Sequence, residues 1–200
     1  MEKLKALVRE DLAAGRVAGV VGIKAEDGHP RPALFTRENL AGLDLLVLGE
    51  DRYPLAQVLL KIARKHPEAV LGIVVRGCDE RAVIELIRNE QLKRERVVLY
   101  GAACDSATAA ACKCPQPFPQ EILAGEKVAP VSDAEEEARW QAMGPEEKLR
   151  YWMDHFARCI RCYGCRNICP ACFCDTCALD DQELLRTGVM PPEIPIFHLI

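Results

Sequence analysis

Seven cysteines fall within nineteen residues near the end of the chain, between Cys159 and Cys177. The first four follow the pattern Cys-x2-Cys-x2-Cys-x3-Cys-Pro, which is the spacing that holds cubane iron–sulfur clusters in bacterial ferredoxins. In that arrangement three thiolates reach one cube, whereas the fourth is carried past it and a proline turns the chain away. The run therefore predicts a ferredoxin-like module. Its cysteines are Cys159, Cys162, Cys165, Cys169, Cys172, Cys174 and Cys177.

Two other interpretations use the same cysteines. Structural zinc could take four thiolates from Cys159-x2-Cys162 and Cys174-x2-Cys177, but three cysteines of the run would then have no role. A disulfide framework needs an oxidising compartment, and the N-terminal residues MEKLKALVRE contain no apolar signal core. The run therefore favours iron–sulfur clusters, and a zinc-stabilised interaction protein remains as an alternative.

The whole chain sets further limits. A length of 200 residues fits one domain with an appended module. The longest apolar runs are far too short to span a bilayer, so we expect a cytoplasmic protein without a membrane span. The net charge of −4 argues against a nucleic-acid partner, because nucleic-acid surfaces are normally basic. Neither glycine-rich phosphate-binding pattern occurs, so the sequence itself gives no sign of a nucleotide cofactor.

Hydrophobic patterning predicts an α/β domain over residues 1–114. A helix is expected at 1–14, strands at 17–23 and 43–48, a turn at 28–32, and a helix opened by Pro54. Strands at 70–75 and 97–100 enclose a helix capped by Asp79, and this βαβ unit implies neighbouring parallel strands. The fold class is thus α/β, a small sheet containing parallel strands with flanking helices. A linker at 115–131 and a helical, cysteine-rich, ferredoxin-like module at 132–200 complete the prediction.

Four further cysteines follow the parallel strands. Cys78 comes just after the first strand and Cys104 just after the second. Ligands of open parallel sheets lie outside the carboxyl ends of the strands, so both thiols should reach one edge. Cys112 and Cys114 follow within ten residues. Each thiol alone would be a buried structural cysteine, but four together beside a ferredoxin-like run predict a second metal site.

The C-terminal module should be helical before its cysteines. Ser132 with Glu135 is typical of a capping box, and Gly144-Pro145 ends one helix and begins another. The second helix has an apolar stripe that is expected to face a core, so that the rigid end of the helix presents Cys159. The stripe contains Leu149, Trp152, Met153 and Phe156. Arg158, Arg161 and Arg166 flank the cysteines and either offset cluster charge or remain solvated. The apolar tail at 196–200 should dock on a partner or on the sheet.

Several of these segments resemble the beta subunits of formate dehydrogenases and coenzyme F-420-reducing hydrogenases. The resemblance is carried by VVRGCDERAVIELI, QLKRERVVLYGAACD and CIRCYGCRNICPACFCDTC, with support from LAAGRVAGVVGI and GEDRYP, and extends over about residues 1–180. Two departures concern the flavin. The family's glycine-rich flavin segment would precede the first residue, and its usual Pro-Cys-Gln is here Gly77-Cys78-Asp79.

The resemblance implies a subunit that carries 4Fe-4S clusters and relays electrons between larger redox subunits. It places Cys78, Cys104, Cys112 and Cys114 at the cluster of the α/β domain. Eleven cysteines supply two cubes, the second held by Cys159, Cys162 and Cys165 with one of the four later thiols. The three remaining cysteines could anchor a third cube only if a non-cysteine ligand, or a ligand from a partner, completed the set. FAD is compatible with the family, although no residue pattern supports it.

The sequence therefore predicts an iron–sulfur electron-transfer subunit of a cytoplasmic, anaerobic oxidoreductase complex. The complex would be of the formate dehydrogenase, hydrogenase or heterodisulfide-reductase type, and the subunit would have no catalytic residues of its own. A flavin-dependent oxidoreductase that uses coenzyme F-420 or a similar hydride carrier is the alternative with an enzymatic role. The substrate of the complex and the direction of electron flow do not follow from the sequence.

Overall fold

A computed structural model describes residues 1–49, 51–160, 162–174 and 176–177. The chain forms two compact units. The first contains Met1–Ser132 and Asn167–Cys172, and the second contains Asp133–Arg166 and the chain from Phe173 onwards. The apolar tail at 196–200, for which we expected a docking role, lies outside the described residues. Among the helices that are described, none has the length and apolar character needed to cross a bilayer.

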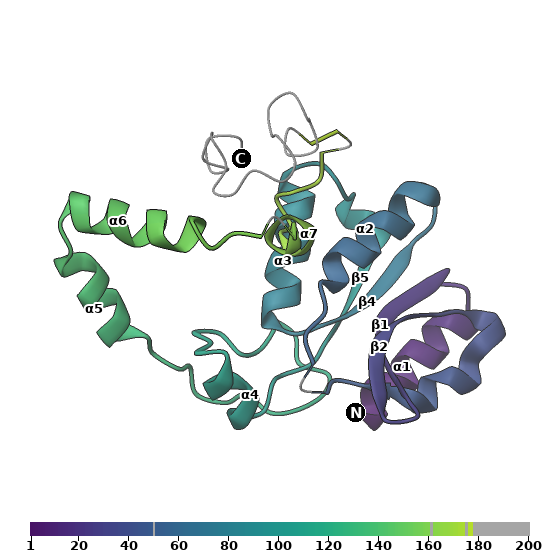
Figure 1. The fold of residues 1–200 in the computed structure, drawn as a ribbon. Coiled ribbons are helices and arrows are strands. Elements are labelled where there is room, and N and C mark those ends of the chain that lie inside the picture. The colour runs from purple at the N-terminus through teal and green to yellow at the C-terminus, as the bar shows by residue number, and fades with distance from the viewer. Residues whose placement is uncertain (50, 161, 175, 178–200) are drawn as a thin grey trace. The chain divides into compact units, whose positions relative to one another are not determined.

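A five-stranded mixed sheet forms the centre of the first unit (Figure 1). Its strands are β1 (Gly19–Glu26), β2 (His29–Phe35), β3 (Leu46–Val47), β4 (Leu71–Val75) and β5 (Val97–Gly101). The order is β2-β1-β4-β5, with β3 also paired to β1. The β1–β4 and β4–β5 pairs are parallel, whereas β2 and β3 run antiparallel to β1. This confirms the predicted α/β fold and the βαβ unit from β4 to β5.

Helices cover both faces of the sheet. On one face α1 (Glu2–Ala13) and the 3-10 helix η1 (Arg37–Leu45) pack over alternate strand residues such as Val20, Val74 and Tyr100. On the other face lie α2 (Leu55–Lys65) and α3 (Gly77–Arg88), as Figure 1 shows. Each helix follows or precedes a strand that it covers, and a short 3-10 helix, η2 (Arg94–Arg96), leads into β5. Every residue of β4 is buried, as expected for a parallel strand covered on both faces.

A buried polar contact fixes α1 to the sheet. The Tyr100 hydroxyl, on β5, donates to Asp11 Oδ2 at 2.5 Å, and Arg16 Nε donates to Asp11 Oδ1 at 2.5 Å. Tyr100 is 1% exposed and Asp11 is 7% exposed. Burial raises the pKa of the Tyr100 hydroxyl far above its usual value, and the charge of Asp11 adds to the effect. The hydroxyl therefore remains a proton donor to the carboxylate.

Two elements of the first unit differ from the sequence-based expectation. The predicted turn at 28–32 belongs largely to β2, because the reversal is a two-residue turn in which Asp27 and Gly28 have φ of 53° and 77°. Asp-Gly is a favoured pair for such a turn, and the prolines of β2 are tolerated at the edge of the sheet. The strand predicted at 43–48 shrinks to β3, since its first residues complete η1, where Leu43 is buried.

The second unit begins with two helices, α5 (Ala134–Ala142) and α6 (Pro145–Phe156). Pro145 is the first residue of α6, as predicted. The N-cap of α5 is Asp133 rather than Ser132. The expectation of an inward-facing stripe on α6 is wrong, because Leu149 and Trp152 are 59% and 47% exposed. Two short helices offer too little surface to bury such a stripe, and the Trp152 ring packs instead against neighbouring rings, that of Trp140 at 5.7 Å between centroids.

Candidate metal centre

Two neighbouring parallel strands each lead into a cysteine at the same edge of the sheet. Val75, which ends β4, is paired with Gly101, which ends β5. Cys78 lies in the first turn of α3, directly after β4, and Cys104 follows β5 after two alanines. α3 begins at Gly77, so Asp79 is not its cap, but its carboxylate accepts the backbone N–H of Arg76 at 3.1 Å. The carboxyl edge of the sheet thus carries the first two predicted ligands.

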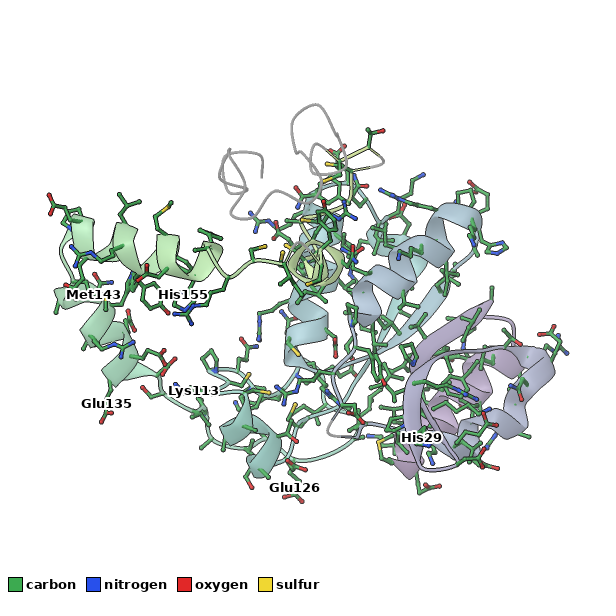
Figure 2. The ribbon with its side chains drawn as sticks, viewed as in Figure 1. His29, Lys113, Glu126, Glu135, Met143 and His155 are labelled. Atoms are coloured by element: carbon green, nitrogen blue, oxygen red, sulfur yellow. The ribbon has the colours of Figure 1, made fainter. Side chains whose placement is uncertain are left out.

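A six-residue helix, α4 (Ser106–Ala111), positions the other two thiols of this edge. Asp105 caps its start by accepting the Thr108 N–H at 2.7 Å, and Cys104 immediately precedes this cap residue. At its end the N–H groups of Lys113 and Cys114 donate to the carbonyls of Ala110 and Ala109, both at 3.0 Å. This is the Schellman arrangement, and Lys113, labelled in Figure 2, takes the required left-handed conformation with φ of 46°. Cys112 and Cys114 therefore flank the turn that ends α4.

Cys104 lies close enough to Cys78, Cys112 and Cys114 for charge on these thiols to interact; we call the four residues the sheet-edge cysteines. Burial raises the pKa of the Cys78 thiol to about 11, with further contributions from Asp79 and from Cys104. Burial also raises the pKa of Cys104, and negative charge on Cys114 and Cys112 adds to this. Cys78 is exposed as a residue, yet protein atoms crowd its sulfur enough to disfavour the thiolate. Without a bound cation, Cys78 and Cys104 therefore favour the neutral thiol.

A return loop, residues 115–131, holds the sheet-edge cysteines in place. Cys104 N–H donates to Pro117 O and Val131 N–H donates to Cys114 O, both at 2.9 Å. The loop passes so close to the ends of β4 and β5 that only glycine fits there. A Cβ atom on Gly77 would lie 2.5 Å from Gln116 O, and one on Gly101 would lie 1.8 Å from Glu121 O. The two glycines admit the loop, and the loop fixes the backbone that carries the thiols.

Three arginines supply positive charge at this edge: Arg52, Arg76 and Arg81, of which Arg76 and Arg81 act to lower the pKa of Cys78. Arg76 is 5% exposed, and its guanidinium group donates to the carbonyls of Leu48, Gly49 and Asp51. Its charge lowers the pKa of Cys104, against the effect of burial. Arg52 is exposed and its Nη1 donates to Cys112 Sγ at 2.7 Å. Sequence reasoning missed these arginines, because Arg52 is far from the cysteines in the chain and the burial of Arg76 depends on the carbonyls of residues 48, 49 and 51.

Two cavities of the first unit border the sheet-edge cysteines. One, of about 630 Å³, is lined by Arg76, Cys104 and Asp105, and by Glu126, which Figure 2 labels. The other, of about 370 Å³, lies between α2 and α3 and is lined by Cys78, Ile168 and Pro170 among others. The site is therefore accessible from two sides rather than closed over by side chains.

The ferredoxin-like run is divided between the two units. Cys159 lies three residues beyond the last residue of α6, Phe156, and its N–H donates to Phe156 O at 3.0 Å. Cys162 precedes the short helix α7 (Gly164–Ile168), and Cys165 lies on it. Cys169 and Cys172 belong to the first unit, where the buried Gln57 side chain donates to Cys169 O at 2.6 Å. Cys174 and Cys177 belong to the second unit.

The eleven cysteines form no disulfide bonds with one another. Within the described ranges, no three side chains of His, Cys, Asp or Glu are already grouped around a position for one metal ion. A cubane binds each of its four thiolates through a different iron atom, so its ligands spread more widely than those of a single ion. The donor set at the sheet edge consists of four thiols from short, well-fixed segments, which suits an iron–sulfur cube. Metal binding by any of the eleven cysteines remains a prediction.

Comparison with known proteins agrees with the resemblance seen in the sequence. Over 50 residues the chain is 44% identical to "F420-dependent formate dehydrogenase subunit beta" of Methanocaldococcus jannaschii. Over 56 residues it is 43% identical to "F420-dependent formate dehydrogenase 1 subunit beta" of Methanococcus maripaludis. These stretches cover 25% and 26% of this chain, but only 13% and 14% of the relatives. No family model matches the chain.

Proposed function

From this similarity to formate dehydrogenase beta subunits over a quarter of the chain, we propose that the protein is an iron–sulfur electron-transfer subunit of an oxidoreductase complex. It would relay electrons through 4Fe-4S clusters between larger redox subunits in an anaerobic cytoplasm. The relatives' names suggest a formate dehydrogenase as the complex.

The observation that carries this proposal is the meeting of four cysteines at the carboxyl edge of a parallel sheet. Cys78 and Cys104 come from adjacent strands, and α4 adds Cys112 and Cys114. Thiolates are the usual ligands of cubane clusters, and a bound cluster would supply one-electron chemistry. The chain's own residues hold the thiols through the return loop, and the arginines bring positive charge to them.

The ferredoxin-like run supports a second cluster. Cys159, Cys162 and Cys165 share the second unit, so three thiolates of one cube can come from a single short segment. The fourth ligand would be one of Cys169, Cys172, Cys174 and Cys177. A relay needs at least an entry and an exit for its electrons, and two clusters on one chain would provide both.

The test of this proposal is metal analysis of anaerobically purified protein. Iron and acid-labile sulfide should each approach about eight atoms per chain, the content of two cubes, and the reduced protein should give electron paramagnetic resonance signals. Stoichiometric zinc without sulfide would instead establish a zinc-stabilised protein. A flavin absorption spectrum would establish the flavin-dependent alternative. Replacement of Cys104 by Ser should remove about four iron atoms. An unchanged circular dichroism spectrum would show that the variant is still folded.

Partnership needs a separate experiment. The tagged protein should be recovered from anaerobic source cells together with a larger oxidoreductase subunit, detectable by native mass spectrometry. Recovery of a monomer that exchanges electrons with several unrelated enzymes would refute the subunit role. The cluster assignment would survive that result, because iron and sulfide are measured on the isolated chain.

A further inference from the structure

Arg76 is a buried charge whose hydrogen-bond partners are neutral. It lies between β4 and α3, and its guanidinium group donates to the backbone carbonyls of Leu48, Gly49 and Asp51. Among the described residues, no carboxylate lies within 4.0 Å of this group, and its charge acts to lower the pKa of Asp79 and of Asp105 only from a longer distance. Burying a charge is costly unless an opposite charge compensates it. An arginine whose charge is compensated only at longer range is able to stabilise a further anion nearby.

The sheet-edge cysteines are in the right place to supply that anion. Arg76 is two residues before Cys78 in the chain and lines the 630 Å³ cavity together with Cys104. A cubane with four thiolate ligands carries a net negative charge, and one-electron reduction makes that charge more negative by one unit. A fixed positive charge beside it therefore stabilises the reduced cluster more than the oxidised one.

We propose that Arg76 is the buried counter-ion of the cluster held by the sheet-edge cysteines, and that it raises the reduction potential of that cluster. The inference rests on the proposed function. The step concerned is the transfer of one electron from another redox centre to the oxidised cube, in which no covalent bond breaks and no proton moves. Arg76 is a positioning residue, because it ligates no metal and acts through the charge it places beside the cube.

Burial distinguishes Arg76 from the other cations of this edge. Because Arg76 is only 5% exposed, water and salt screen its charge weakly. Arg52 also reaches the site, through its bond to Cys112 Sγ, but it is exposed and its charge is screened more strongly. Arg88, on the far end of α3, is exposed and pairs with Glu85 at 3.1 Å. These two residues give a graded set of controls for the loss of one positive charge.

The experiment is an anaerobic redox titration followed by electron paramagnetic resonance on the full-length protein. Wild type is compared with Arg76→Gln, Arg76→Lys, Arg52→Gln and Arg88→Gln. The Cys104→Ser variant identifies the signal of the sheet-edge cluster, because that signal should be lost. For Arg76→Gln we expect the equilibrium constant for reduction of this cluster to fall at least about ten-fold, which is about 59 mV for a one-electron couple. Arg76→Lys should remain near wild type, Arg52→Gln should shift less, and Arg88→Gln should not shift.

The remaining outcomes are also decisive. If Arg76→Gln fails to take up the cluster while Arg76→Lys takes it up, the need for positive charge is supported. An unchanged potential in Arg76→Gln overturns the proposal, and so does an equal shift or an equal loss of cluster in the Gln and Lys variants, which would show a purely steric role. Absence of iron and sulfide from wild type would instead refute the proposed function, so the two failures are distinguishable.

Discussion

Replacing Gly101 by alanine tests whether the return loop holds the sheet-edge cysteines. The new Cβ atom would lie 1.8 Å from Glu121 O, whereas a carbon and a carbonyl oxygen need about 3.3 Å. The loop backbone would therefore move by about 1.5 Å. That movement would break the hydrogen bonds from the Leu123 and Ala124 N–H groups to Gly101 O, which are 2.8 and 3.3 Å long. At about 1 kcal/mol for each bond and 1–3 kcal/mol for overpacking, we expect destabilisation of about 3–5 kcal/mol.

The assay is urea unfolding under anaerobic conditions, followed by circular dichroism, with iron measured on the same samples. Gly19→Ala is the matched control. Its Cβ atom would lie 2.9 Å from Leu34 Cδ1, at the end of a side chain that is 41% exposed and can turn away. Gly19→Ala should change the free energy of unfolding by no more than about 1 kcal/mol, whereas Gly101→Ala should also lose iron. Equal stabilities for Gly101→Ala and wild type would refute the packing of the return loop.

Three further predictions concern other parts of the chain. Cys162→Ser should remove about four iron atoms and leave the sheet-edge cluster, and loss of all iron from a still folded protein would contradict two separate sites. Tyr100→Phe should lower the free energy of unfolding by about 2 kcal/mol, because Asp11 loses a buried hydrogen bond. The pKa of Tyr100 is raised in the folded state, so the contribution of its hydroxyl to stability is complete below about pH 10 and falls as the pH rises above that value. The free energy of unfolding of Tyr100→Phe, measured in urea, should therefore be less sensitive to alkaline pH than that of wild type. Equal sensitivity of the two proteins would contradict the raised pKa. Lys113→Gly should stabilise the chain by up to about 1 kcal/mol in urea while Lys113→Val destabilises it, and the reverse order would contradict the left-handed turn.

The sheet and the placement of two cysteines were predictable because they follow from local rules. Apolar strands at 70–75 and 97–100 with a helix between them require parallel neighbours, and parallel strands end at one edge. Cys78 and Cys104 could therefore be assigned to that edge from their positions alone. The Asp27-Gly28 pair is also a known hairpin signal, but the turn predicted at 28–32 leaves Asp27 out and extends into β2.

The parts that escaped prediction depend on contacts between distant residues. Arg76 is buried because carbonyls of residues 48, 49 and 51 accept its hydrogen bonds, and nothing in the local sequence indicates that a loop so far back reaches it. Gly77 and Gly101 are required only because the return loop passes over them. Lys113 adopts a conformation that its side chain disfavours, so local propensity argues against the turn that the structure contains.

The length of α4 constrains how this protein can vary. Three of the four sheet-edge cysteines lie in the eleven residues from Cys104 to Cys114, on either side of one six-residue helix. One inserted residue would rotate Cys112 and Cys114 by about 100° about the helix axis and move them by about 1.5 Å. Related sequences should therefore accept many substitutions at the exposed positions 107, 110 and 111, but not at the buried Ala109, and should tolerate almost no insertions or deletions in the helix. In this segment the number of residues would be inherited more strictly than their identity.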